Sequence, residues 1–377
     1  MSDRTISAVR AIPVSQTVRP QFAIVSAAGS QPESHFVVVE IQADDGTIGY
    51  GEASVVPVWS GETQAGARHV IESRIAPALM GRDPLDIAAL ADEMDRLLAG
   101  NPFTKAGVEM ALIDLAGRLL KVPVATLLGG PLRTPEIPLK FSIGAMPADR
   151  AAEVALAAAA MGLRAVKVKV GLDLQTDIER VQAVRSALGD EFGIGVDANG
   201  GWTESEAVNA IPHLEELGVN VFEQPLARGD FRGCARLRHR TAIPIMIDEG
   251  IFTRREALEA IRLEACDLIS IYPGKNGGIR RSLEIAQLAA TAGLKCVIGS
   301  NLEMDLGSAA MLHLAVAAPA LSTSVYHDII GPLYYEARLS DPPIPFRNGC
   351  AVVPNGPGLG VKLNPDLGKL EFDLGAL

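Results

Sequence analysis

The sequence contains few cysteines, and their spacing rules out the chemistry that clustered cysteines perform. The four cysteines are Cys234, Cys266, Cys296 and Cys350. No two of them form a CxxC motif, and their spacing does not match a disulfide framework. A small disulfide-stabilised domain and a thiolate zinc site are therefore excluded. We expect these cysteines to pack as small apolar residues.

Long apolar runs and an excess of basic residues are also absent. No stretch of about 18 uninterrupted apolar residues occurs, and residues 1–10 carry charges where a signal peptide would be apolar. The formal net charge is -11, whereas binding to nucleic acid or to an anionic membrane needs a basic surface. The sequence therefore predicts a cytoplasmic protein with a small-molecule partner, and neither nucleic acid nor a membrane is expected to bind.

The chain does have enough apolar residues, 48% of 377, to fill one large domain and a smaller one. Residues 36–53 alternate as two strands around the turn Asp44-Asp45-Gly46. Residues 62–128 then have helical spacing, which Gly129-Gly130-Pro131 ends. We therefore expect an α+β capping domain over residues 1–130.

Beyond Pro138, short apolar runs alternate with helical segments, which predicts parallel strands joined by crossover helices. Eight strands are expected, over residues 139–143, 165–170, 193–197, 220–223, 243–248, 268–272, 295–298 and 323–327. Eight such units in about two hundred residues favour a (β/α)₈ TIM-type barrel over an open doubly wound sheet. The barrel is expected over residues 131–340. The Pro- and Gly-rich tail, residues 341–377, is expected to pack back on the capping domain.

Three carboxylates stand at the ends of consecutive predicted strands. Asp197, Glu223 and Asp248 are spaced 26 and 25 residues apart, so a barrel would bring them together at one mouth. Buried carboxylates need a compensating charge, which is either a neighbouring Lys or Arg on each of them or one shared cation. Three consecutive acids favour the cation. Because the available ligands are oxygens, the sequence predicts Mg²⁺, with Mn²⁺ as a substitute.

Two lysines precede these acids in the expected strand order. Lys167 and Lys169 are two residues apart, so both side chains point to the same side of their strand. An exposed strand would make them a solvated stripe, but a parallel barrel strand is covered on both faces. A lysine beside another cation loses its proton more readily and can serve as a general base. The lysines and the metal together predict removal of a proton alpha to a carboxylate, through an enolate held by the metal.

With these residues in this order, the chain resembles the enolase superfamily, in particular its muconate-lactonizing branch within the mandelate racemase/muconate lactonizing enzyme family. The motifs that carry the resemblance are Lys167-Val168-Lys169, Asp197-Ala198-Asn199, Glu223-Gln224-Pro225, Asp248-Glu249, Gly277-Gly278 and residues 356–360. The resemblance implies that Lys169 is the base and that Lys167 makes it easier to deprotonate. It also implies that Asp197, Glu223 and Asp248 bind Mg²⁺, that Asn199 supports them, and that the chain forms a homo-oligomer.

One position departs from the family pattern. Members usually carry a second catalytic lysine in the sixth strand, and the equivalent position here is Tyr272. Lys275 follows three residues later, after a Pro-Gly bend, so it is either a loop lysine or a group that reaches the site. A tyrosine is a poor base at neutral pH but a good hydrogen-bond donor.

This departure favours a reaction that needs one base. The expected function is muconate-type cycloisomerisation or syn-dehydration of a small carboxylic acid. The first alternative is a racemase or epimerase of an amino-acid derivative. That alternative is weakened because Ile330 stands where dipeptide epimerases of this branch carry the second acid of an Asp-x-Asp motif. The alternative from another class is a catalytically inactive Mg²⁺-binding relative.

Substrate contacts are implied by the family's use of capping-domain loops over the barrel mouth. The equivalent segments here are residues 21–30 and 58–60, in which Trp59 either covers an apolar ligand or only packs. Glu303 and Asp328, at the ends of the seventh and eighth predicted strands, are also substrate-contact candidates. None of the histidines matches the His-Asp pair of the mandelate racemase branch, although His327 stands at a strand end.

Overall fold

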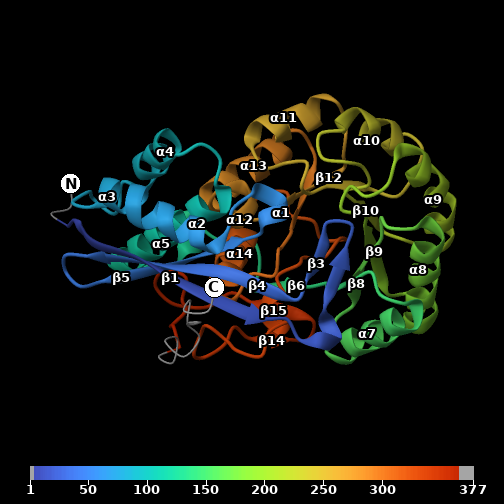
Figure 1. Ribbon diagram of the computed structural model, residues 1–377, viewed down its shortest axis with the longest axis horizontal. Helices are drawn as coiled ribbons and strands as arrows, with labels where there is room; N and C mark the ends of the chain where they lie inside the picture. Colours follow the sequence, from blue (N-terminus) through green and yellow to red (C-terminus); the bar gives the residue numbers. More distant parts are fainter. Residues whose placement is uncertain (1–3, 365–377) are drawn as a thin grey trace.

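The computed structural model describes residues 4–364 and begins with an antiparallel sheet (Figure 1). Its strands are β1 (Ile6–Thr17), β4 (Glu33–Ala43) and β5 (Ile48–Val55), in the order β1-β4-β5. The predicted hairpin between β4 and β5 is confirmed, and Gly46 takes the positive φ of 85° that its turn requires. A short hairpin of β2 (Ile24–Ser26) and β3 (Gly29–Gln31) branches from the sheet.

Helices cover this sheet in the order that the helical spacing predicts. They are α1 (Pro57–Ser60), α2 (Gln64–Val70), a π-helical turn (Ile71–Ile75), α3 (Ala76–Leu79), α4 (Ile87–Leu97), α5 (Pro102–Leu120) and α6 (Val124–Leu127). The central helix α5 packs very closely on β5. A Cβ atom on Gly51 of β5 would lie 2.0 Å from the backbone oxygen of Gly107 in α5, so only glycine allows this approach.

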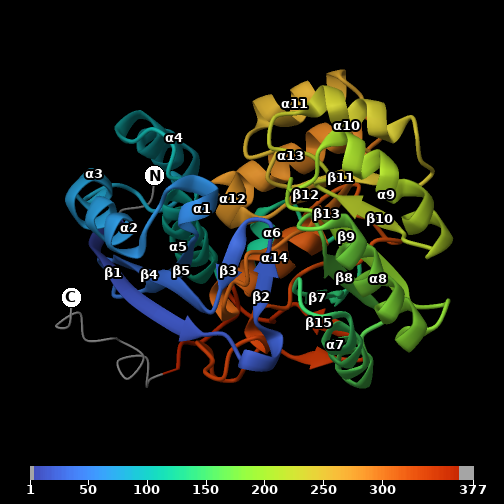
Figure 2. The ribbon, with the colours of Figure 1, turned by 45° about the vertical axis from the view of Figure 1, so that its right-hand side comes forward.

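A parallel sheet of seven strands follows and curls into a barrel with its helices outside, as Figure 2 shows. The strands are β7 (Phe141–Ile143), β8 (Ala165–Lys169), β9 (Gly193–Asp197), β10 (Val221–Glu223), β11 (Ile245–Ile247), β12 (Leu268–Ile271) and β13 (Lys295–Ile298). The helices are α7 (Ala148–Ala160), α8 (Leu174–Leu188), α9 (Glu204–Glu216), α10 (Phe231–Arg238), α11 (Arg254–Arg262), α12 (Pro273–Asn276), α13 (Ile279–Thr291) and α14 (Asp305–Ala317). The TIM-type fold is therefore confirmed.

The prediction of an eighth strand over residues 323–327 is wrong, because these residues form no regular strand. This segment makes only isolated parallel bridges, from Leu139 to His327 and from Cys296 to Leu321. The Ser322 hydroxyl accepts a hydrogen bond from the Val325 amide (2.9 Å), and this local turn replaces a regular ladder. The segment still closes the barrel, because its backbone bonds β13 on one side and residues 138–140 on the other.

The tail contacts both parts of the molecule. Its strand β15 (Cys350–Val352) pairs with β6 (Glu136–Pro138) and with β14 (Phe346–Arg347). Further on, the Leu359 amide donates to Asp114 of α5 at 2.7 Å. The domain limits at residues 130 and 340 stay a prediction, and residues 365–377 of the tail lie outside the described residues. Within residues 4–364, no helix combines the length and apolar content needed to cross a membrane.

A buried carboxylate of the capping helix α5 lies at the start of a barrel helix. Glu109 accepts hydrogen bonds from the Ile279 amide (2.7 Å) and the Arg280 amide (3.1 Å), the first two residues of α13. These amides have no partner within their own helix, so the carboxylate satisfies them. Burial nevertheless outweighs these bonds and raises the pKa of Glu109 to about 7.

This burial predicts a pH-dependent stability that Glu109→Gln should remove. Because the folded pKa of about 7 is above the ordinary value of 4.5, the folded chain binds more protons than the unfolded chain in this window. The contribution of Glu109 to stability therefore falls as pH rises from 4.5 to 7. Between pH 4.5 and 8, the free energy of unfolding of Glu109→Gln should increase by on the order of 3 kcal/mol relative to that of the unsubstituted protein.

Guanidinium unfolding at the two pH values measures this gain. Glu259→Gln, at an exposed position of α11, is the control and should show no such change. An equal effect of Glu109→Gln at both pH values would contradict the assignment.

Candidate active site

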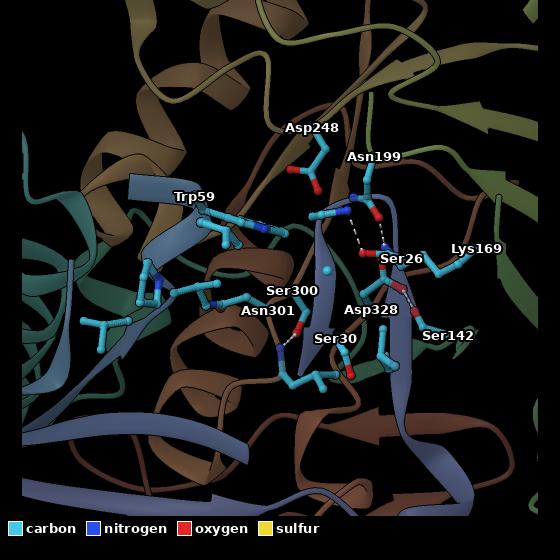
Figure 3. Close-up of a pocket in the computed structure, with 18 of the residues that line it drawn as sticks. Ser26, Ser30, Trp59, Ser142, Lys169, Asn199, Asp248, Ser300, Asn301 and Asp328 are labelled. Atoms are coloured by element: carbon cyan, nitrogen blue, oxygen red, sulfur yellow. Dashed lines mark hydrogen bonds between the residues drawn. The ribbon is translucent and has the colours of Figure 1, made fainter. Parts of the chain in front are cut away.

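A cavity of about 290 Å³ lies where the carboxyl ends of the barrel strands meet the capping segments (Figure 3). The barrel contributes polar and charged lining residues, which are Ser142, Lys167, Lys169, Asn199, Asp248, Ser300, Asn301 and Asp328. The β2–β3 hairpin and α1 supply the facing wall, with Ser26, Ser30 and Trp59. Figure 3 shows Trp59 and Lys169 at opposite sides of the cavity. Both predicted capping segments therefore line it.

Strand register brings the charged groups together. Lys169 of β8 pairs with Asp197 of β9, and Asp197 pairs with Glu223 of β10. Asp248 directly follows β11, the next strand of the sheet. Successive strands thus deliver one lysine and three carboxylates to neighbouring positions at the same barrel end.

Lys167 is the centre of a buried ion-pair cluster. Its Nζ lies 3.0 Å from Asp328 Oδ2, 3.1 Å from Glu223 Oε2 and 3.4 Å from Asp197 Oδ2. Burial opposes its charge, but these three carboxylates outweigh burial and raise the pKa of Lys167 well above its ordinary value. Lys167 is therefore a permanent cation at neutral pH.

Lys169 shares a carboxylate with Lys167. Its Nζ donates to Asp197 Oδ2 at 2.6 Å and to Asn199 Oδ1 at 2.8 Å. Burial acts to raise the pKa of Asp197, but Lys169 and Lys167 lower it below its ordinary value. Asn199 also donates to Glu249 at 3.2 Å, which fixes the amide that orients Lys169. The two ammonium groups contact the same oxygen atom, as the spacing of the two lysines predicts.

The carboxylates of Asp197, Glu223 and Asp248 lie near one another, and the repulsion between their charges favours a cation. Glu223 is fully buried, and burial together with Asp197 raises its pKa well above the ordinary value, although Lys167 opposes this. Over residues 4–364, no three acidic, histidine or cysteine side chains are already gathered as a metal site. Lys169 bonds the Asp197 carboxylate, and Lys275 bonds the Asp248 carboxylate. The oxygen-only donor set fits a hard divalent ion.

The structure places the ammonium group of Lys275 against the Asp248 carboxylate. The residue is fully buried, and its Nζ donates to Asp248 Oδ1 (2.7 Å), Asp248 O (2.7 Å) and Ser270 O (2.8 Å). Three acceptors therefore occupy the three donors of this ammonium group. Lys275 is not among the residues that line the active cavity.

Tyr272 is fully buried beside Lys275, which lies 5.0 Å from the centre of its ring. Its ring is 6.2 Å from that of Trp59, and its hydroxyl has no hydrogen-bond partner in the described part of the chain. Burial, reinforced by Asp248, raises the pKa of Tyr272 well above its ordinary value. The hydroxyl therefore stays protonated and can donate a hydrogen bond but cannot remove a proton.

The other substrate-contact candidates differ in their placement. Asp328 lines the cavity, but Lys140 (2.9 Å) and Lys167 (3.0 Å) already bind its carboxylate. Glu303 is buried away from the cavity and accepts a hydrogen bond from the lining residue Ser300 at 2.5 Å. His327 does not line the cavity; it accepts the Ile298 amide at 3.2 Å, and burial lowers its pKa to about 3, so it is neutral.

Several lining residues were not predicted from the sequence. Glu33 and His35 reach the cavity from β4, and Ser300 and Asn301 from the loop after β13. Only Ser142 carried a signal, because it is the polar residue between two apolar ones in β7 and pairs with Lys167. The positions of the other residues depend on how the capping unit docks on the barrel, and local sequence patterns do not predict that docking.

Comparison with known proteins agrees with this geometry. The family model described as mandelate racemase/muconate lactonizing enzyme, N-terminal domain, matches residues 8–129, and the one described as enolase C-terminal domain-like matches residues 149–367. The chain belongs to the mandelate racemase/muconate lactonizing enzyme family of the enolase superfamily. It is thus an enzyme whose relatives include several isomerases, in a superfamily whose members generally use Mg²⁺.

Its relatives within this family have different activities. Muconate cycloisomerase 1 of Rhodococcus opacus is 34% identical over 93% of this chain and 94% of that protein. The N-succinyl-L-Arg/Lys racemase of Bacillus cereus is 32% identical over 96% of each chain. The crystal structure of 2-chloromuconate cycloisomerase from Rhodococcus opacus superposes with a TM-score of 0.93 at 34% identity, covering 98% of this chain and all of that one. Membership of the family therefore leaves the substrate open.

Two lysines share the carboxylate of Asp328, and this pairing predicts that Asp328 stabilises the folded protein. Asp328→Asn leaves Lys140 and Lys167 with less counter-charge in a buried site and should lower the free energy of unfolding by about 3 kcal/mol. Adding Lys140→Met should restore part of the loss, since it removes one unpaired charge. Denaturant unfolding of the single and double variants measures both. A loss under about 0.5 kcal/mol for Asp328→Asn would show that the pairing adds little, as exposed ion pairs do.

Proposed function

We propose that the protein removes or adds a proton alpha to the carboxylate of a small carboxylic acid, with Lys169 as its single base. The reaction is then a muconate-type cycloisomerisation or a syn-dehydration, because both need a base on one face only. The observation that carries the proposal is the asymmetry of the cavity. Lys169 lines it, whereas Tyr272 replaces the expected second lysine and Lys275 has its ammonium group bound by three oxygens.

We infer that Asp197, Glu223 and Asp248 hold Mg²⁺, with Mn²⁺ as a substitute. Their burial, mutual crowding and oxygen-only chemistry support this assignment. Bound there, the ion would supply positive charge that stabilises the enolate form of the substrate carboxylate.

The chain's own residues would divide the remaining work. Lys169 donates to Asp197 and Asn199, so it must release a proton before it can accept one from the substrate. Lys167 stays charged and shares the Asp197 carboxylate with Lys169. Trp59 and Ile330 give the cavity an apolar wall that would exclude water from the reacting carbon. Tyr272 would contribute a hydrogen bond or an apolar surface, but no base.

The racemase alternative rests on the relative from Bacillus cereus, at 32% identity. Racemisation requires a group that exchanges protons on each face of the enolate, and within residues 4–364 the lysines that line the cavity are Lys167 and Lys169, both from β8. Relatives named muconate and 2-chloromuconate cycloisomerase support the one-base reaction. Assembly as a homo-oligomer, which the family resemblance implies, stays a prediction.

The metal assignment predicts that Asp197→Ala, Glu223→Ala and Asp248→Ala each weaken Mg²⁺ binding at least about tenfold, because each removes a ligand and not only a supporting group. Titration calorimetry measures the affinity, and circular dichroism checks that each variant is folded. Asp149→Ala, at an exposed position of α7, is the matched control and should bind Mg²⁺ normally. Undiminished affinity in all three variants would end the assignment.

The base assignment predicts that Lys169→Ala lowers alpha-proton exchange in D₂O by roughly 10² to 10⁴, the usual contribution of a positioned base. Tyr272→Phe is the matched comparison and should retain exchange, because its hydroxyl stays protonated. A library of small carboxylic acids with Mg²⁺, read by mass spectrometry, supplies the measurement.

Two results of that screen would reject the proposal. Racemisation of a chiral acid at comparable rates from both faces would require a second base, for which Lys275 is the first candidate. Mg²⁺ binding without exchange on any acid would instead indicate an inactive relative.

A further inference from the structure

A second cavity, of about 580 Å³, lies on the outer side of Trp59. It is about twice the volume of the active cavity, and Trp59 lines both. The capping helices α1, α4 and α5 form one wall, and the barrel helices α11, α12 and α13 form the other. Figures 1 and 2 both show α1 beside α12, with α11 and α13 on the barrel side. We call this second cavity the outer groove.

The lining of the outer groove is cationic, although the whole chain has a net charge of -11. Six basic residues line it, which are Lys105, Arg228, Arg254, Arg255, Lys275 and Arg281, against two acidic ones, Asp95 and Glu256. Asp95 is already shared by Lys105, at 2.8 Å, and Arg281. Its charge is therefore not available to the other arginines.

Glu256 is also committed, but to the start of helix α11. Its Oε2 accepts hydrogen bonds from the amides of Phe252 and Thr253 and from the Thr253 hydroxyl, as a capping box. Its other oxygen lies 3.8 Å from Arg228, which is beyond hydrogen-bond distance. Arg254 pairs outside the groove lining, with Glu284 at 3.1 Å.

Arg228 and Arg255 thus have unused hydrogen-bond donors. The Arg228 guanidinium lies 4.0 Å above the Phe252 ring, and a single donor of that group reaches the backbone oxygen of Trp59, at 3.3 Å. Arg255 is exposed and has no hydrogen bond or ion pair to the residues that the structure describes. The planar fork of a guanidinium matches the oxygens of a carboxylate or phosphate. The neighbouring ring of Trp59, which is half-buried, offers an apolar surface for the rest of a ligand, whereas Phe252 is buried beneath Arg228.

We propose that the outer groove is a second ligand site, which binds a small organic anion. Its carboxylate or phosphate group contacts Arg228 and Arg255, and its flat or apolar body packs against Trp59. The site is distinct from the active cavity, and the proposal is independent of the reaction assigned to that cavity. Trp59 lines both cavities, and Arg228 donates to its backbone oxygen from the groove side.

Tryptophan fluorescence tests this proposal directly. The chain has two tryptophans, and Trp202 is 4% exposed and packs against Phe222, so Trp59 is the one that reports on the groove. Titration with phenyl phosphate or benzoate should give a saturable change, which Trp59→Phe removes. Benzyl alcohol, which has the ring without the charge, should give none. Whichever anion binds more tightly identifies the preferred headgroup, and either preference supports the site.

Variants locate the binding. The double variant Arg228→Gln with Arg255→Gln should weaken anion binding at least about tenfold, since it removes two charge-assisted contacts. Arg262→Gln, at the exposed far end of the same helix α11, is the matched control and should bind normally. Lys169→Met should also bind normally, because it alters only the active cavity. Thermal unfolding confirms that each variant is folded.

Three outcomes overturn the proposal. The first is unchanged affinity in the Arg228→Gln, Arg255→Gln double variant. The second is loss of the signal in Lys169→Met, which would place the anion in the active cavity. The third is equal binding of benzyl alcohol, or no saturable change with either anion.

Discussion

The pairing of buried ammonium and carboxylate groups at the barrel mouth is the constraint on which the site depends. A buried charge without a partner costs several kcal/mol, so no member of this set can be removed without affecting the others. Lys167 contacts three carboxylates, and Lys169 shares one of them. The strands deliver these groups in register, so the barrel must close accurately for each charge to find its partner.

The capping unit completes this arrangement by supplying carboxylates to barrel helices. Glu109 accepts the first amides of α13, and Glu52 of β5 accepts the amides of Met304 (2.8 Å) and Gly307 (2.9 Å) at the start of α14. The loop before α14 lines the active cavity with Ser300 and Asn301. The capping unit therefore fixes the ends of the barrel elements that carry Tyr272 and Ser300, besides covering the cavity with Trp59.

The features that the sequence mispredicted or left open share one physical origin. The eighth strand was expected from its apolar residues, but Ser322 forms a local turn, and only the neighbouring strands hold the segment in place. Lys275 follows a Pro-Gly bend that resembles a loop, yet the short helix α12 turns its side chain inward to Asp248. Asp328, a substrate-contact candidate, lines the cavity, and two lysines bind its carboxylate. In each case the result depends on partners distant in the chain.

The sequence by itself determined the hairpin of β4 and β5, seven barrel strands, and the placement of Lys167, Lys169, Asp197, Glu223 and Asp248 at adjacent strand ends. These features follow from local periodicity, because a side chain's direction along a strand and the spacing of βα units are set by the covalent chain. Only the tertiary structure decided which carboxylate pairs with which lysine. It also decided that Tyr272 is buried beside Trp59 and that helices with basic side chains line the outer groove. Those outcomes depend on how the capping unit docks on the barrel, and docking is fixed by contacts between residues far apart in sequence.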